Sequence, residues 1–178
     1  MDITITEALA EVPTISKRIA KKQQFVLDFL YRPSVIRDAH EKEGGSAELI
    51  KQNLQGIADL EQRLIAIRSG IAKSNAATKI TIGATTRTIT DWLTWRREVS
   101  EGQRQRLGNM ASTLRQMRAK AQQQGTKVSE QTTESLTDIV VNVNEKDLSD
   151  QIEALETTLG ALDGQLSLKN ATVSIALP

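Results

Sequence analysis

Few residues in this sequence could carry chemistry, and the single histidine, His40, is the first of them. It lies in the polar stretch DAHEKE, residues 38–43, where Asp38, His40 and Glu43 could together bind a divalent cation. One histidine cannot build a multi-histidine metal site within one chain. We interpret the stretch as a solvated loop and predict no metal.

Other chemical motifs are missing from the sequence. There are no cysteines, which excludes a thiolate site and a disulfide framework. Neither GxGxxG nor GxxxxGK[ST] is present, so no phosphate-binding loop is indicated. The pair Asp147 and Asp150 lies at the start of a predicted helix, where carboxylates favour the helix dipole. We therefore predict a protein that is not an enzyme and that binds neither a cofactor nor a small-molecule substrate.

Trp92, Trp95, Arg96 and Arg97 form the densest group of residues typical of protein interfaces. One interpretation is an exposed contact surface built from all four. The other is that the tryptophans are core at the end of the helices. In the second interpretation the arginines pair with acids that follow them closely, Glu98 and Glu101.

The elements that position these residues are predicted to be long helices. Hydrophobic residues make up 39% of the 178 residues but aromatics only 3%, which is typical of amphipathic helices with aliphatic stripes. We predict a mainly α fold of long antiparallel helical hairpins, a coiled-coil-like bundle of four helices with a small β-hairpin and short terminal strands. Residues 1–178 are predicted to form a single elongated domain with a loose two-part plan.

Residues 1–74 are predicted to form the first helical hairpin, after a short strand over Asp2–Thr6. Pro13 either starts the first helix or kinks it. Ser46 is expected to cap the second helix. In that helix Asn53 falls within a heptad seam, where a polar side chain can fix register. The first row of apolar residues is Leu9, Val12, Ile15, Ile19, Val26 and Leu30, interrupted by Lys22, and the seam of the second helix is Ile50, Asn53, Ile57, Leu60, Leu64, Ile67 and Ile71.

The remaining elements follow from alternation and helical spacing. Residues 75–90 predict a β-hairpin, with strands over 79–82 and 87–90. Residues 91–125 predict a third helix capped by Thr90 or Asp91, residues 126–146 a polar loop and a strand, and residues 147–178 a fourth helix and a C-terminal strand. The rows are Leu107, Met110, Leu114, Met117 and Ala121 in the third helix, and Leu148, Ile152, Leu155, Leu159, Leu162 and Leu166 in the fourth.

The third and fourth helices are complementary in charge. Residues 87–120 hold eight basic and three acidic residues, a net charge of +5, whereas residues 126–166 hold two basic and nine acidic residues, a net charge of −7. We expect the two helices to pair antiparallel, with charge setting partner and orientation. A basic face free for phosphate backbones is the alternative, but the overall charge of +1 argues against specific nucleic-acid binding.

Two stretches of the sequence follow the pattern of a known family. The first comprises Asn75-x-x-Thr78, Gly83, the run 86–90 and the helix DWLTWRREV, and the second is LDGQLSLKNATVSI. In these stretches the sequence resembles the septicolysin-like family. Leu93, Arg97 and Glu98 fall at family positions, whereas Ala171 stands where the family has tryptophan. The resemblance implies antiparallel helices, small β elements and oligomerisation, without catalytic residues. The stretch TITDWLTWRREV also resembles proteins of tailed bacteriophages and prophages.

Together these features predict a non-enzymatic structural protein that oligomerises through helical seams and edge strands. The resemblance places it in a tailed-phage virion, assembled in the bacterial cytoplasm, as a head-decorating, cementing or tail-associated component. Its partners would be further copies of itself and other virion proteins. A cytoplasmic protein and a membrane-active, pore-forming protein are the alternatives, although no run of apolar residues is long enough to span a bilayer. The expected contact residues in the terminal strands are Ile3, Ile5, Val173 and Ile175.

Overall fold

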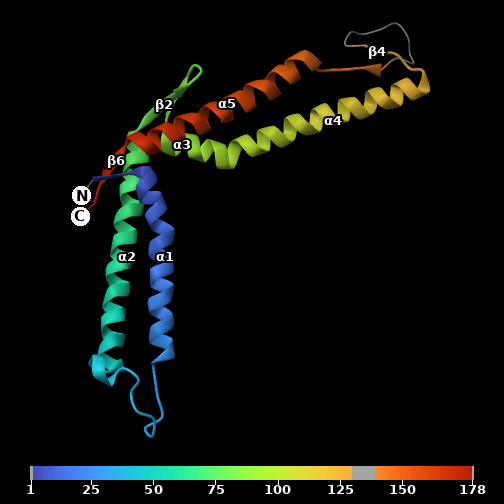
Figure 1. Ribbon diagram of the computed structural model, residues 1–178. Helices are drawn as coiled ribbons and strands as arrows, with labels where there is room; N and C mark the ends of the chain where they lie inside the picture. Colours follow the sequence, from blue (N-terminus) through green and yellow to red (C-terminus); the bar gives the residue numbers. More distant parts are fainter. Residues whose placement is uncertain (1, 130–138, 178) are drawn as a thin grey trace. The chain divides into compact units, whose positions relative to one another are not determined.

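The structure, a computed structural model, describes residues 2–129 and 139–177 and divides into two compact units. The first unit comprises Met1–Ala77 and Ser167–Pro178, and the second Thr78–Leu166. Long helices with a few short strands make up both units, so the predicted mainly α fold with small β elements is confirmed (Figure 1). That 1–178 forms one elongated domain stays a prediction.

The first unit is a helical hairpin with a two-stranded sheet. Its elements are β1 (Asp2–Thr4), α1 (Ile5–Asp28), the 3₁₀ turn η1 (Glu41–Glu43), α2 (Ser46–Ala77) and β6 (Ser174–Ala176), which follows the end of α5 (Glu145–Thr172). β1 and β6 pair antiparallel, with Ile3 opposite Ile175. The termini of the described chain therefore meet in one sheet.

The predicted strand over residues 2–6 is too long, because α1 begins at Ile5. Thr4 and Glu7 form a capping box, in which the Thr4 hydroxyl accepts from the Glu7 N–H at 3.2 Å and the Glu7 carboxylate accepts from the Thr4 N–H at 2.8 Å. Two free amides of the first helical turn are thereby satisfied. The Glu7 carboxylate accepts from the Thr4 N–H and also from the Thr4 hydroxyl, and these two bonds, the backbone one first, lower the pKa of Glu7.

The row of apolar residues predicted for the first helix is only partly correct. Leu9 and Leu30, predicted in the apolar row, are exposed, whereas Ile5 and Ala8 are buried. Pro13 lies inside α1 on an exposed position, so the helix continues through it. The row that α1 buries or half-buries is Ile5, Ala8, Val12, Ile15, Ile19, Lys22, Val26 and Phe29.

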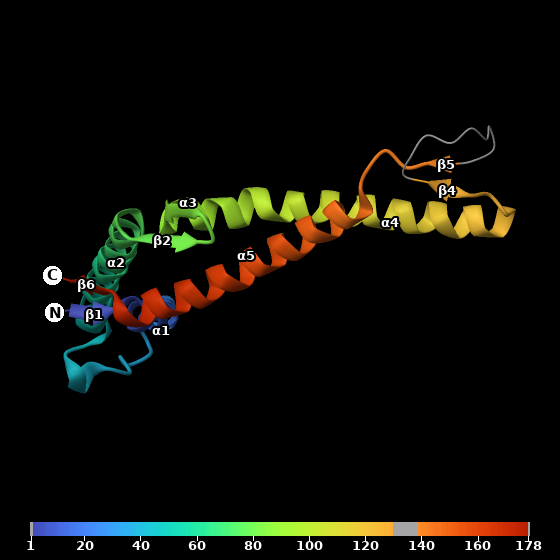
Figure 2. The same ribbon diagram turned by 90° about the horizontal axis from the view of Figure 1, so that it is seen from above.

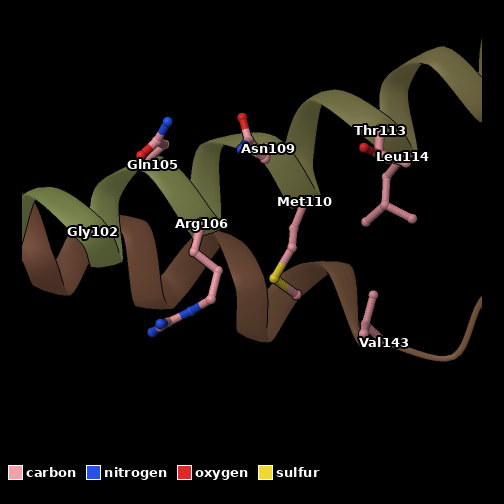
Figure 3. A pocket seen from close by; sticks show the side chains of 8 residues that line it. All are labelled: Gly102, Gln105, Arg106, Asn109, Met110, Thr113, Leu114 and Val143. Carbon is pink, nitrogen blue, oxygen red and sulfur yellow. The ribbon is translucent and has the colours of Figure 1, made fainter.

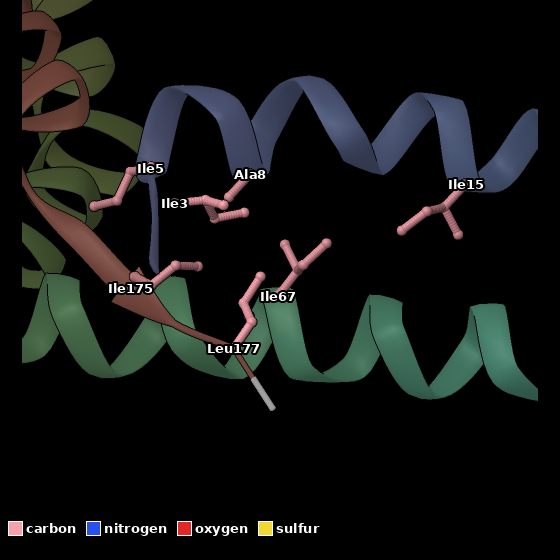
Figure 4. Close-up of a cluster of buried hydrophobic side chains, with 7 residues drawn as sticks. All are labelled: Ile3, Ile5, Ala8, Ile15, Ile67, Ile175 and Leu177. Carbon is pink, nitrogen blue, oxygen red and sulfur yellow. The ribbon is translucent and has the colours of Figure 1, made fainter. Parts of the chain in front are cut away.

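The predicted seam of α2 is confirmed. Every position from Ile50 to Ile71 in that row is buried or half-buried. Ile67 is completely buried and points toward α1 (Figure 4). The surrounding cluster of buried side chains, from β1, α1, α2 and the C-terminal segment, is Ile3, Ile5, Ala8, Ile15, Ile67, Ile175 and Leu177.

The two polar residues in the seams of the first hairpin meet each other. The Lys22 ammonium group donates to the Asn53 side-chain oxygen at 3.3 Å, and the Asn53 amide donates to the Leu49 carbonyl at 2.8 Å. Gly56 leaves room beside the lysine, since a Cβ added there would lie 2.9 Å from Lys22 Nζ. This bond penalises a shifted pairing of α1 with α2, in which both groups would lose their partner.

The second unit combines a β-hairpin with a second helical hairpin. Its elements are β2 (Lys79–Ile82), β3 (Thr85–Thr88), α3 (Ile89–Thr94), the π-helical turn η2 (Trp95–Ser100), α4 (Glu101–Gln124), β4 (Val128–Ser129), β5 (Ile139–Val140) and the greater part of α5. The predicted β-hairpin is present, but its second strand spans Thr85–Thr88 instead of residues 87–90. The residue that caps α3 is Thr88, in a capping box with Asp91, and not Thr90 or Asp91 as predicted. Gly83 turns the hairpin with a φ of 57°, which glycine adopts without strain.

The helices α4 and α5 pair antiparallel, and the prediction from charge is confirmed (Figure 1). Successive arginines of η2 and α4 bond to acids whose order along α5 is reversed. The pairs are Arg96 with Asp163 at 2.7 Å, Arg104 with Glu156 at 2.8 Å, and Arg118 with Glu145. These pairs are partly exposed, so they specify orientation more than they stabilise the fold. The predicted apolar rows of both helices are buried or half-buried throughout.

A small parallel sheet lies between α4 and α5 in the chain. β4 pairs with β5, with Val128 opposite Ile139 (Figure 2). The strand predicted within residues 126–146, over 138–144, is shorter than expected, because β5 spans Ile139–Val140. Of the two caps that the sequence offers for the last helix, Asn144 and Asp147, the structure has Asn144, which accepts from the amides of Lys146 and Asp147. Residues 130–138 of the predicted polar loop lie outside the described residues.

We predict that Ile67→Ala lowers the free energy of unfolding by about 2–5 kcal/mol, because it opens a cavity in the seam. Ile65→Ala is the matched control on the exposed side of the same helix, and its cost stays within about 0.5 kcal/mol. Urea unfolding followed by circular dichroism measures both. Equal costs for the two variants would contradict the assigned seam.

Candidate functional site

Trp92 lies in the core of the second unit rather than on its surface. Its indole N–H donates to the Ile80 carbonyl at 3.2 Å, and the side chain is 3% exposed. Trp95, half-buried, packs edge-on against Trp92 with ring centroids 5.5 Å apart. The Arg87 guanidinium lies 5.0 Å from the Trp92 ring centroid, in cation–π range. Trp92 is therefore a core residue, as in the second of the two interpretations of the sequence.

The two arginines beside the tryptophans are both ion-paired. Arg97 pairs with Glu98 at 2.7 Å, as expected for local pairing, but Arg96 pairs with Asp163 of α5 and not with Glu101. Arg96 therefore helps to join η2 to α5. A contact role for Trp92, Trp95, Arg96 and Arg97 stays a prediction.

The contact residues predicted in the terminal strands belong to the core of the first unit. Ile3, Ile5 and Ile175 are buried, and Val173 is half-buried against the same cluster. The Ile5 N–H donates to the Val173 carbonyl at 3.0 Å, which joins the start of α1 to the C-terminal segment. Ile5 is helical and not part of a strand, so only backbone edges of the β1–β6 pair remain for a partner.

His40 packs against α1 instead of being solvated. Its ring lies 4.6 Å from Phe29 and 5.4 Å from Phe25, centroid to centroid, and its Nδ1 lies 3.2 Å from the Glu43 carboxylate. Its Nε2 is buried without a hydrogen-bond partner among the described residues. Within the described ranges no three histidine, cysteine or acidic side chains are grouped so as to hold a metal ion.

Asp38 holds the start of α2 and is not placed beside His40 as a ligand. Its carboxylate accepts from the Ser46 hydroxyl at 2.5 Å, the Ser46 N–H at 2.9 Å and the His40 N–H at 2.9 Å. The Ser46 hydroxyl, followed by the two amides, lowers the pKa of Asp38 to about 2. The prediction that Ser46 caps α2 is wrong. Ser46 is the first residue of α2, and its hydroxyl donates to the Asp38 carboxylate.

The connection between α1 and α2 exposes large apolar side chains that the sequence analysis did not single out. We call residues 27–36 the tip segment. Val35 is 92% and Tyr31 85% exposed, values that leave these side chains almost wholly in water. Leu54 of α2 is exposed as well and lines a shallow groove together with Leu27. The exposed apolar side chains of the tip segment are Leu27, Leu30, Tyr31, Val35 and Ile36.

Local hydrogen bonds link residues within the tip segment. The Arg32 guanidinium donates to the Ile36 carbonyl, and the Ile36 N–H donates to the Pro33 carbonyl at 3.0 Å. Beyond it, Arg37 pairs with Glu41, and Asp38 fixes the chain to the start of α2. The exposed apolar side chains are thus presented by a constrained loop.

The second unit carries an open groove of about 700 Å³ along α4, which we call the α4 groove. Met110 and Leu114 point from α4 toward the segment that carries Val143, while Gln105 and Asn109 point away from it (Figure 3). Arg106 also lines the groove and makes no ion pair within residues 2–129 and 139–177. The groove thus joins the apolar side chains of Met110, Leu114 and Val143 to the guanidinium group of Arg106.

Comparison with known proteins supports the fold alone. No family model matches the chain, and no curated protein matches it. The chain is similar to a solved structure described as a functionally unknown conserved protein from Corynebacterium diphtheriae, with a TM-score of 0.55 and 16% sequence identity. The similarity covers 99% of this chain and 100% of the other. The same arrangement of elements therefore occurs in a protein of very different sequence.

We predict that the stabilising effect of Asp38 depends on pH. Because its pKa is lowered from an ordinary value of 3.8 to about 2, its contribution is complete above pH 4 and is lost as the pH falls toward 2. Asp38→Asn should therefore be less stable than the natural chain at pH 7, and the difference should shrink between pH 4 and pH 2. Urea unfolding at several pH values measures it.

Asp59→Asn, in the middle of α2, is the matched control and should have a smaller effect at pH 7. A difference between Asp38→Asn and the natural chain that is as large at pH 2 as at pH 7 would contradict the assigned cap.

Proposed function

We propose that this protein is a non-enzymatic structural or assembly protein that associates with itself through the tip segment. The observation that carries the proposal is the group of large apolar side chains exposed on a constrained loop. Contiguous apolar surface that stays uncovered in one chain is typical of a site for another protein. Tyr31 and Arg32 are also of the types that dominate binding energy at interfaces.

The conformation of the loop favours association. A loop that is already ordered loses little conformational freedom on binding, so more of the contact energy appears as affinity. The bonds of Arg32 and Asp38 supply this order before any partner arrives.

The helical seams are occupied within each unit. The apolar row of α2 faces α1, and the row of α5 packs against α4 in the second unit. Association through those rows would require the hairpins to open. The tip segment needs no such opening, so we assign the contact to it and not to the seams.

The setting that we propose is a tailed-phage particle, on the strength of the sequence resemblance. Its partners there would be copies of itself and other virion proteins, with no specific nucleic acid and no small-molecule substrate. The alternative of a membrane-active protein also draws on the exposed tip segment. None of the helices in the described ranges combines the length and apolar character needed to cross a bilayer.

The proposal predicts that the natural chain has a mass above that of one chain in light scattering after size exclusion, rising with concentration. The double variant Tyr31→Ser, Val35→Ser should have the mass of one chain, because it removes the two most exposed apolar side chains. Ile65→Ser, which removes an exposed isoleucine of α2 away from the tip, is the matched control and should associate normally.

A natural chain that stays monomeric throughout the concentration series would overturn this function. Dye release from liposomes tests the alternative function of a membrane-active protein. Leakage caused by the natural chain but not by the double variant would favour the membrane-active protein.

A further inference from the structure

We propose that the α4 groove binds a linear amphiphile, a molecule with an unbranched apolar chain and one anionic head group, of which a medium-length fatty acid is the simplest example. The inference goes beyond the proposed function and does not depend on it, because the groove lies in the second unit and the tip segment in the first. The molecule is held as a structural ligand and is not converted.

The size and form of the groove suit a small elongated ligand. Its volume of about 700 Å³ falls within the roughly 300–1,000 Å³ typical of ligand sites. The lining residues of α4 run from Gly102 to Leu114 at spacings of three and four, which places them along one face of the helix. A stable contact with another protein usually buries about 800 Å² on each partner, far more than a strip of three apolar side chains provides.

Polarity is segregated along the groove. Met110, Leu114 and Val143 all follow Arg106 in the chain, so the charge and the apolar side chains do not alternate. Arg106 and Met110 extend from α4 to the same side, on which Val143 lies (Figure 3). From Arg106 to Leu114 the helix rises by about 12 Å, which is the length of a short extended acyl chain. Methionine is flexible and polarizable, so Met110 can adapt to such a chain.

Arg106 selects the charge of the head group. Its guanidinium makes no ion pair with any residue that the structure describes. Glu101, the only acid of α4, lines a different pocket beside Arg104, and no carboxylate is among the described residues that line the α4 groove. A guanidinium can donate two parallel N–H bonds to one carboxylate. The head group that fits is therefore a carboxylate, and a cationic head would be repelled.

Isothermal titration calorimetry with dodecanoate, kept below the concentration at which it forms micelles, tests the site. The natural chain should bind one dodecanoate per chain. Dodecyltrimethylammonium, which has the same apolar chain and a cationic head, should bind at least tenfold more weakly. Acetate, which has the carboxylate without the chain, should give no measurable binding.

Two groove variants, each with a matched control, locate the ligand. Arg106→Gln should lower the affinity for dodecanoate about tenfold, because the bond to the charged head is lost. Arg115→Gln removes an arginine of the same helix that does not line the groove, and it should bind like the natural chain. Val143→Asp charges the wall that holds the chain and should abolish binding, whereas Val140→Asp adds the same charge at an exposed valine outside the groove and should not.

The double variant Tyr31→Ser, Val35→Ser separates the groove from the tip segment, whose exposed apolar side chains could also attract an amphiphile. It should bind dodecanoate like the natural chain. Circular dichroism confirms that each variant is folded before its affinity is compared. A natural chain that associates with itself but binds no dodecanoate overturns this inference alone, and a monomeric natural chain that binds dodecanoate overturns the proposed function alone.

The other contradicting outcomes are equally distinct. Binding that both groove variants retain, or that the double tip variant loses, places the amphiphile outside the α4 groove. Equal affinities for dodecanoate and dodecyltrimethylammonium would show that Arg106 does not select the head group. If the groove variants, but not their controls, reduce the mass of the natural assembly in light scattering and the natural chain binds no dodecanoate, the occupant of the groove is a protein.

Discussion

Packing of one apolar row against another between two antiparallel helices is the interaction on which both units depend. Each helix of a two-helix hairpin buries a single stripe, so the stripe must supply most of the stabilisation. In the first unit a spacing of three and four residues brings Ile15 and Ile67 into one core. The polar pair Lys22 and Asn53 interrupts the rows at one place and thereby adds specificity of register.

The same local device starts the first helix of each unit. The sequence ITITE, residues 3–7, and the sequence TITD, residues 88–91, both end a strand and open a helix through a capping box. In each case the isoleucine after the threonine is buried, and its N–H bonds to a carbonyl of a segment distant in the chain or across the hairpin. A strand can become a helix within one residue there because the cap satisfies the free amides.

These devices explain what the sequence could and could not predict. Seven-residue spacing predicted the seams of α2 and α5 because it depends on side-chain period alone. The start of α1 was misjudged because Ile3 and Ile5 alternate with threonines as in a strand, while the decisive bond, from Thr4 to Glu7, has no periodicity. The tip segment was overlooked for a related reason. Its apolar side chains follow no helical or strand period, so the residue pattern does not show whether another element covers them.

The candidate contact residues show a second limit of prediction from the sequence, because a residue type that is common at interfaces can also be buried in the core. Trp92 has the composition of an interface residue, yet the Ile80 carbonyl satisfies its indole and the neighbouring hairpin covers its ring. An interface-prone residue type therefore indicates a partner only when the chain itself leaves it uncovered. Once the periodic apolar rows are buried within each unit, the large apolar side chains that are still exposed lie outside these rows. They include those of the tip segment, where Val35 and Tyr31 are the most exposed of the large apolar side chains in the described residues.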